Sequence, residues 1–172
     1  MERIRDAMTR VRELLRIKPE RGRRVVTSHV RLDEQLRCTV VDGAWTLPVD
    51  MSTNTGGDGS APDPGVYART ALGACVAIAY RMWAAADGLS LESVDVEVQA
   101  DNDAAGLFGV SDVAPGYRAV RLVARITTSA DPVALARALD AAESHSPYLS
   151  MFRRPVPVTV QREVVVPEGV QG

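Results

Sequence analysis

The sequence predicts an α+β fold, in which helices and strands do not alternate as a regular parallel repeat. Three observations lead to this prediction. Apolar residues recur at helical spacing near the N-terminus, they alternate with polar residues in several short stretches, and two Asp-Pro pairs are typical of helix starts. The expected order is a helix, three strands, a long helix, two strands, a second helix and a final strand.

Length and composition restrict the class of protein. The chain has 172 residues and 46% of them are hydrophobic, which is enough for one domain with a real core. The net charge of −2 indicates neither a nucleic-acid-binding surface nor a disordered acidic chain. No apolar run is long enough to span a bilayer, and the N-terminus lacks a secretory hydrophobic region. We therefore expect a cytoplasmic protein with no nucleic-acid or membrane partner.

The cysteines and histidines do not predict a metal site. Cys38, Cys75, His29 and His145 are the only residues of these two types, and their spacing matches no usual zinc motif. In a reducing compartment we expect both thiols to be free. Pairing of the two cysteines is the less favoured alternative, because sequence alone does not place their Cα atoms within disulfide reach.

The first residues predict an amphipathic helix that ends before Pro19. Residues 1–24 contain nine basic and four acidic side chains, so this segment carries a charge of +5 and the remainder carries −7. We expect residues 1–22 to form an arm held partly by charge. A membrane surface or a nucleic acid is a less favoured partner, because the apolar stripe lacks an aromatic anchor. Docking on another protein is a third alternative.

Residues 24–50 predict a three-stranded meander. Its strands are expected at 24–32, 35–41 and 44–50, with turns at 33–34 and 42–43. The segment that follows is rich in glycine, serine and asparagine, which predicts a long loop. Loops of this length in a small domain are often functional.

Two Asp-Pro pairs predict the starts of the longer helices. Asp63 and Pro64 open a helix that runs to Asp87, where Gly88 is the stop signal. Small residues fill its first two-thirds, so we expect a central helix packed against another helix, which a second subunit can supply. A second Asp-Pro pair at residues 131–132 opens a helix that ends near residue 145.

The remaining stretches predict an antiparallel hairpin and a closing strand. Residues 93–101 alternate valine with polar side chains, and residues 117–129 supply the partner strand. Residues 146–155 are interpreted as a further short helical turn, and residues 156–166 as the last strand. Because valine alternates with polar residues in 93–101, we expect one face of the hairpin to pack on the core and the other, its wet face, to be exposed to solvent.

Three stretches resemble the OsmC-like family, which includes the organic hydroperoxide resistance proteins. They are the glycine-rich loop TNTGGDGSAPDP, the helix ALGACVAIAYRMWA and the helix end SHSPYLS. The resemblance covers residues 25–166 and implies an intertwined homodimer, in which antiparallel sheets enclose two central helices. The predicted domains are an arm at 1–22, an OsmC-like domain at 23–168 and a loose tail at 169–172.

The resemblance also implies roles for individual residues. Cys75 matches the peroxidatic cysteine, and Arg37 best matches the arginine that stabilises its thiolate, commonly from the partner chain. Ser146 stands where the family has a resolving cysteine, so it cannot close the family's disulfide. Gly65 stands where the hydroperoxide-resistance members have a glutamate.

Further residues of the central helix have two interpretations. Tyr80, Met82 and Trp83 are core or interface residues, or they line the apolar pocket that admits an organic peroxide together with Ser146. A helical cysteine such as Cys75 is similarly an inert space-filler or a nucleophile, since its surroundings decide its reactivity.

Two functions follow from these interpretations. In the first, Cys75 reduces organic or hydrogen peroxides in oxidative stress defence by a one-cysteine cycle. An external thiol is then the reductant, and no cofactor or metal takes part. In the second, the protein is a non-catalytic OsmC-like member that binds an apolar small molecule or senses redox state with a degenerate site.

Overall fold

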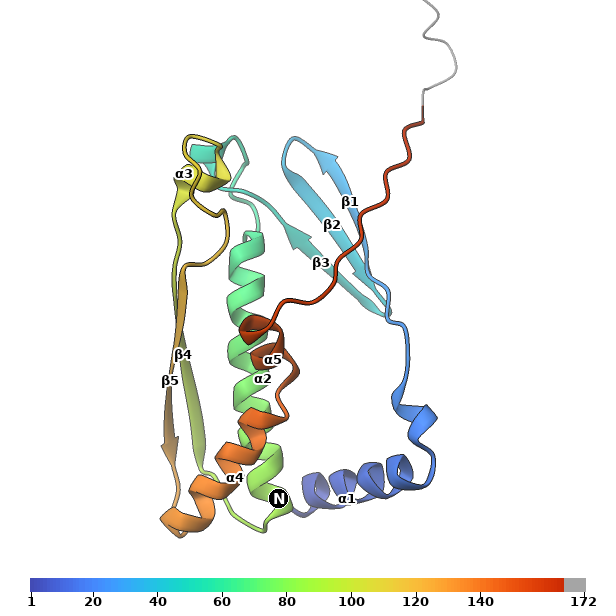
Figure 1. Cartoon of the computed structure of the whole chain (residues 1–172), viewed down its shortest axis with the longest axis vertical. Helices are drawn as coiled ribbons and strands as arrows, with labels where there is room; N and C mark the ends of the chain where they lie inside the picture. Colours follow the sequence, from blue (N-terminus) through green and yellow to red (C-terminus); the bar gives the residue numbers. More distant parts are fainter. Residues whose placement is uncertain (166–172) are drawn as a thin grey trace, which may run out of the picture.

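Five α-helices and five strands lie within residues 1–165, the part of the chain that this computed structural model describes (Figure 1). The elements are α1 (Glu2–Ile17), η1 (Pro19–Gly22), β1 (His29–Glu34), β2 (Arg37–Asp42), β3 (Trp45–Val49), η2 (Thr53–Thr55), α2 (Pro64–Ala86), β4 (Ser93–Asp101), α3 (Ala104–Leu107), β5 (Ala119–Thr127), α4 (Pro132–Ser144) and α5 (Pro147–Arg153). Strands β1–β2–β3 form one antiparallel sheet and β4–β5 form another. The predicted α+β class is confirmed.

The starts of the three helices that surround the core follow one local rule. Asp63, Asp131 and Ser146 are the N-caps of α2, α4 and α5, and each side chain accepts a hydrogen bond from a backbone N–H three residues later. A proline follows each cap at the first helical position, where its missing N–H costs nothing. Gly88, with φ of +75°, follows α2 as predicted.

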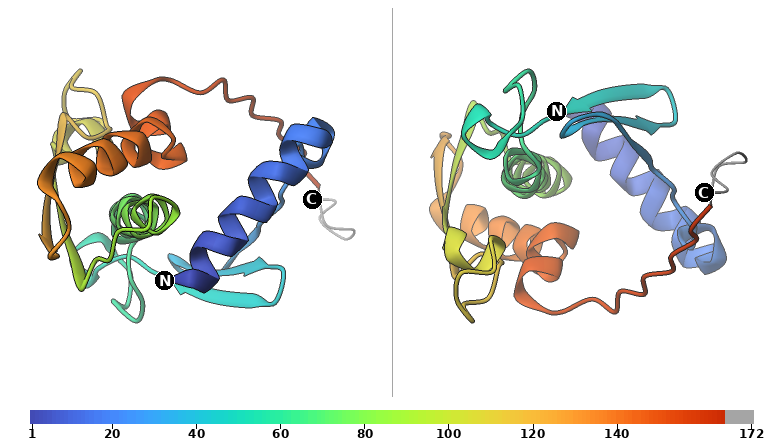
Figure 2. Two further views of the ribbon diagram at one scale, coloured as in Figure 1. Left: turned by 90° about the horizontal axis from the view of Figure 1, so that it is seen from below. Right: turned by 90° about the horizontal axis from the view of Figure 1, so that it is seen from above.

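The packed half of the molecule is built around α2. The β4–β5 hairpin and α4 lie on one side of α2, as the view along this helix shows (Figure 2). The core joins side chains from α2, the loop after it, α4 and α5: Leu72, Val76, Tyr80, Ala84, Leu91, Ala142 and Leu149. Alternate residues of the hairpin pack against this core and the others face solvent. The one wet face of the hairpin is therefore confirmed.

Small residues let the elements of this half approach closely. A Cβ at Gly73 would lie 2.9 Å from Cγ2 of Val98, so only glycine lets α2 come this near to β4. Ala84 of α2 and Ala142 of α4 are both fully buried. Within one chain, the small residues of α2 thus meet a strand and helix α4.

The other half of the molecule is open. The sheet β1–β2–β3 stands apart from α2 in both views, and the arm α1 lies across the lower end of α2 (Figures 1 and 2). The Tyr67 hydroxyl of α2 donates a hydrogen bond of 2.6 Å to the carbonyl oxygen of Pro48 in β3. This contact ties the first turn of α2 to the end of the sheet.

One face of the open sheet is apolar. The antiparallel register, with side chains alternating between faces, puts the following residues on one face: Val30, Leu32, Cys38, Val40, Leu47 and Val49. Val30 is 63% exposed and Leu32 is 60% exposed within the single chain. An apolar sheet face of this kind normally packs against another element.

The structure corrects several sequence predictions. The first strand begins at His29 rather than residue 24 and runs to Glu34, because the turn lies at Gln35 and Leu36, where Gln35 has φ of +48°. The short helix α3 lies between the two predicted strands of the hairpin, where no helix was predicted. Residues 156–165 do not form the predicted final strand, because a strand needs a hydrogen-bonded neighbour and this stretch has none within residues 1–165. Residue 166 and the predicted tail at 169–172 lie outside the described residues.

Candidate functional site

Cys75 lies in the middle of α2 beside the start of α5. Its side chain is half-buried, and its Sγ atom is 3.5 Å from Oγ of Ser146, within hydrogen-bonding distance for sulfur. Ser146 is only 2% exposed. The structure therefore brings these two predicted site residues together, although they are 71 positions apart in the chain.

The Ser146 hydroxyl has a free proton for the sulfur atom. Its oxygen accepts a hydrogen bond of 3.4 Å from the backbone N–H of Leu149, which uses a lone pair and not the proton. The O–H group can then donate to Sγ of Cys75, or the S–H group can donate to the hydroxyl oxygen. A hydroxyl at this place can form a hydrogen bond with the sulfur, but it cannot form a disulfide with it.

The position that matches the family's glutamate is filled by other side chains. A Cβ at Gly65 would lie 3.0 Å from Nη1 of Arg69 and 3.2 Å from the hydroxyl oxygen of Tyr117. Arg69 donates a hydrogen bond of 3.0 Å to that hydroxyl, which in turn donates one of 3.2 Å to the carbonyl oxygen of Gly65. A glutamate at this position would require these neighbours to move. Sequence reasoning missed Tyr117, which is far away in the chain.

The structure does not bring Arg37 to Cys75 within one chain. Arg37 begins β2 opposite Glu34, and its side chain is exposed on the sheet that stands apart from α2. Within residues 1–165, Cys75 has a hydrogen bond to Ser146 but neither a hydrogen bond nor an ion pair to Arg37. The role of Arg37 therefore stays a prediction that requires a second copy of the chain.

The residues predicted to line one pocket lie in different places. Tyr80 is buried in the packed half, where it lines a cavity of about 270 Å³ with Val76, Leu122 and Arg153. Its hydroxyl donates a hydrogen bond of 2.8 Å to Glu143. Burial, followed by this hydrogen bond and the charge of Glu143, raises the pKa of Tyr80 above its ordinary value of 10.

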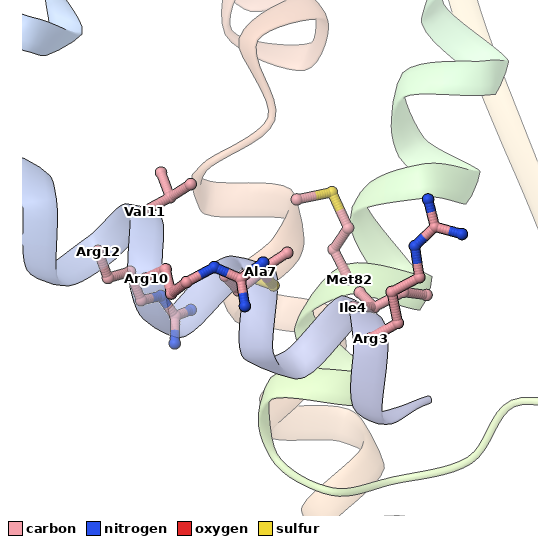
Figure 3. Close-up of a pocket in the computed structure, with 8 residues that line it drawn as sticks. Arg3, Ile4, Ala7, Arg10, Val11, Arg12 and Met82 are labelled. Carbon is pink, nitrogen blue, oxygen red and sulfur yellow. The ribbon is translucent and has the colours of Figure 1, made fainter.

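Met82 lines a different hollow, at the seam between α1 and α2 (Figure 3). This hollow has a volume of about 560 Å³ and its surface is almost entirely apolar. Ile4 and Met8 of α1 contribute to it, and the stems of Arg3 and Arg10 complete its wall. Met82 therefore faces the arm, whereas Tyr80 faces the core.

Trp83 connects the arm with α4. The guanidinium carbon of Arg12 lies 4.5 Å from the centre of the Trp83 ring. The centres of the Trp83 and His145 rings are 4.6 Å apart. His145 ends α4 and directly precedes Ser146. The contact between Arg12 and Trp83 has no signal in the sequence, since such a contact depends on how two helices pack.

The described residues offer no donor set for a metal ion. Within residues 1–165, no three His, Cys, Asp or Glu side chains gather closely enough to hold one. Cys38 and Cys75 are both free thiols, as predicted. Among the helices of this part of the chain, none is both long enough and apolar enough to cross a membrane.

Comparison with known proteins identifies the family. The sequence pattern of the OsmC-like protein family matches residues 57–161, which is more than half of the chain and includes Cys75 and Ser146. No curated protein matches the sequence significantly.

Solved structures agree with this assignment. An OsmC-like protein from Mycoplasma pneumoniae is 14% identical, with a TM-score of 0.63 over 76% of this chain and 88% of that one. An organic hydroperoxide resistance protein from Legionella pneumophila is 22% identical, with a TM-score of 0.56 over 76% of this chain and 90% of that one. At these identities the similarity shows the fold alone. Together with the sequence match, it shows that the chain belongs to the OsmC-like family.

Proposed function

We propose that this protein is a one-cysteine thiol peroxidase for organic or hydrogen peroxides, with Cys75 as the nucleophile and an external small thiol as the reductant. The observation that carries the proposal is the pair of Cys75 and Ser146, whose side-chain atoms Sγ and Oγ lie 3.5 Å apart. Membership in the OsmC-like family supports the reaction class. The cytoplasm, where small thiols are abundant, is the proposed location.

The proposed cycle needs no second cysteine. The Cys75 thiolate attacks one peroxide oxygen, the O–O bond breaks, and the leaving alkoxide takes a proton to become an alcohol or water. Cys75 is thereby oxidised to a sulfenic acid. An external thiol condenses with this acid, releasing water and leaving a mixed disulfide. A second external thiol then restores the Cys75 thiol and leaves as the oxidised disulfide.

Ser146 cannot resolve the sulfenic acid as a cysteine would, and we assign it a hydrogen-bonding role instead. Its O–H group donates toward the sulfur in the thiolate state, and it can donate to the sulfenate oxygen after oxidation. Because no thiol stands at this position, the sulfenic acid waits for an external partner. The half-exposed position of Cys75 is consistent with access for such a partner.

The proposal includes a homodimer. Helix α2 carries an open stripe of Thr70, Ala74 and Ile78, at the spacing of one helix face. Ile78 is 59% exposed, and the sheet β1–β2–β3 presents a second uncovered apolar face. A two-fold pairing would cover both surfaces. Arg37 is on the other face from its neighbour Cys38, at the start of β2, so we propose that Arg37 of the partner subunit reaches Cys75 around the end of the strand and stabilises its thiolate.

The test is the rate at which Cys75 is oxidised by cumene hydroperoxide and by hydrogen peroxide, with a sulfenic-acid trap present. We expect fast oxidation that prefers the organic peroxide, disappears in Cys75→Ser and falls at least tenfold in Arg37→Ala, about the effect of one lost electrostatic contact. Cys38→Ser is the matched control and should retain the rate. A wild-type rate no better than that of free cysteine would contradict the peroxidase and favour a binding or redox-sensing protein.

A further inference from the structure

The arm α1 lies outside the part of the chain that the family match covers, yet a continuous set of contacts leads from it to Cys75. We propose that α1 positions the Ser146 hydroxyl against Cys75, through Arg12, Trp83 and His145. The arm is then a working part of the cysteine site. Its effect on peroxide reduction rests on the proposed function, whereas its effect on the position of Ser146 does not.

The first step is the contact between the arm and α2. The Arg12 guanidinium lies 4.5 Å from the centre of the Trp83 ring, within the range of a cation–π interaction. Met8 is the one residue of α1 that is buried, and the apolar residues further along the helix are exposed. Few side chains therefore hold the arm, so loss of the Arg12 contact should loosen it.

The second step runs from α2 to the end of α4. The rings of Trp83 and His145 are 4.6 Å apart between centres, at an angle of 32°. His145 is itself fixed, because its Nδ1 atom lies 2.8 Å from the carbonyl oxygen of Ala141 in the last turn of α4. One indole ring is thus in contact with both the arm and the residue that ends α4.

The third step runs along the backbone to the cysteine. His145 is bonded to Ser146, the buried N-cap of α5. The oxygen of Ser146 is held by the Leu149 N–H at 3.4 Å and contacts Sγ of Cys75 at 3.5 Å. The bond from Leu149 is near the long end of the range for N–H···O, so it holds the Ser146 hydroxyl weakly, and a shift of the α4–α5 corner would move that hydroxyl away from the sulfur. The arm controls such a shift because Trp83 packs against this corner.

The consequence is measurable at the thiol. When the arm is displaced, the Trp83 and His145 rings can shift, and the Ser146 proton no longer points reliably at Cys75. A negatively charged sulfur loses a donor, so the thiol reacts more slowly with electrophiles. Coupling through packed side chains of this kind changes rates by about three- to tenfold.

The experiment compares Arg12→Ala with Arg10→Ala in the full chain, in a Cys38→Ser and Trp45→Phe background. Arg10 is on the same arm and makes no cation–π contact with Trp83, so it controls for the loss of one positive charge. The rate of Cys75 alkylation by the neutral reagent iodoacetamide reports on the thiol, and Trp83 fluorescence reports on the arm. We expect Arg12→Ala to change the fluorescence and to slow alkylation about three- to tenfold, and Arg12→Lys to restore much of the rate.

A double-mutant cycle identifies the route. If the arm acts through Ser146, Arg12→Ala should have no further effect on alkylation in a Ser146→Ala background. Equal effects of Arg12→Ala in both backgrounds, or changed fluorescence without a changed rate, would overturn the inference. So would an Arg12→Ala variant that leaves both readouts unchanged. If Arg12→Ala slows alkylation only when Ser146 is present, but the wild type does not react with peroxides, the proposed peroxidase is overturned and the role of the arm stands.

Discussion

Helix α2 has two faces that differ in what covers them. Leu72, Val76, Tyr80 and Ala84 point toward the hairpin and α4, and all four are buried. The stripe on the opposite side contains Thr70, Ala74 and Ile78, and it is exposed within the single chain. The same helix therefore acts as a core element on one side and as an uncovered surface on the other.

The cysteine site is divided between the two halves of the molecule in the same way. Cys75 lies between the two faces, and the packed half supplies Ser146 to it. The open half holds the sheet with Arg37, which no contact within residues 1–165 brings to the cysteine. A single chain thus completes the hydrogen-bonding part of the site. We expect the charged part to require a second chain.

The largest effect is expected on the packed face. Leu72 is 1% exposed, and its replacement by alanine leaves a cavity between α2 and its neighbours. Leu72→Ala should lower the free energy of unfolding by about 2–5 kcal/mol, measured by urea denaturation. Ile78→Ala is the matched control on the open face, and under conditions that keep the protein monomeric it should cost about 0.5 kcal/mol or less. Similar costs for both variants would contradict the division into two faces.

The next effect concerns the open face. Ile78→Asp places a charge in the middle of the uncovered stripe, where a second copy is proposed to pack. We expect the dimer dissociation constant to rise about 100-fold or more while the monomer stays folded, measured by analytical ultracentrifugation and circular dichroism. Val123→Asp, at a residue on the wet face of the hairpin that is 41% exposed, should leave the dissociation constant unchanged. An Ile78→Asp protein that is as dimeric as the wild type would place the interface elsewhere.

Local patterns were sufficient to predict the elements on the packed side. The Asp-Pro pairs at 63–64 and 131–132 fixed the starts of α2 and α4, because a cap acts within a few residues of itself. The alternation of residues 93–101 predicted both β4 and its wet face. The pairing of Cys75 with Ser146 came from the family resemblance, since nothing local connects two residues 71 positions apart.

Long-range contacts could not be predicted in the same way. Tyr80, Met82 and Trp83 are neighbours in sequence, but a helix turns by about 100° per residue, so they face the core, the arm hollow and α4. The valine-rich stretch after residue 155 has the alternation of a strand and no neighbour within the described chain. The alternating pattern favours an extended strand, but a strand forms only where a neighbouring strand supplies its hydrogen bonds.

A third prediction concerns the link between the two halves. Asp50 follows β3 and is 1% exposed, and it accepts hydrogen bonds from the backbone N–H and hydroxyl of Ser60 and from the N–H of Met51. The bonds from Ser60, followed by that from Met51, lower the pKa of Asp50 below its ordinary value of 3.8. Because the pKa of Asp50 is lower in the folded state, the ionised carboxylate stabilises the fold at pH values above 3.8. The contribution is lost as the pH falls through the lowered pKa.

The check for Asp50 is urea unfolding of the wild type and Asp50→Asn at several pH values. The variant should be less stable at pH 7, and the difference should shrink as the pH falls below 3.8. Asp112→Asn, at an exposed aspartate in the loop before β5, controls for the loss of a charge. A difference that does not change with pH would show that Asp50 acts by shape and not by charge.

The smallest effect is expected within the packed face, at the hydroxyl of Tyr80. Tyr80→Phe keeps the ring and removes one hydrogen bond to Glu143, which should cost about 1 kcal/mol of unfolding free energy. Tyr148→Phe, at a tyrosine that is 37% exposed, is the control. The pKa of Tyr80 is raised, so its hydrogen bond is fully present at pH 10 and is lost only as the pH rises through the folded-state value. The folded wild type and Tyr80→Phe should therefore have the same phenolate absorbance near pH 10. A smaller absorbance there would mean that water reaches this hydroxyl, and that the packed face of α2 is less closed than its burial indicates.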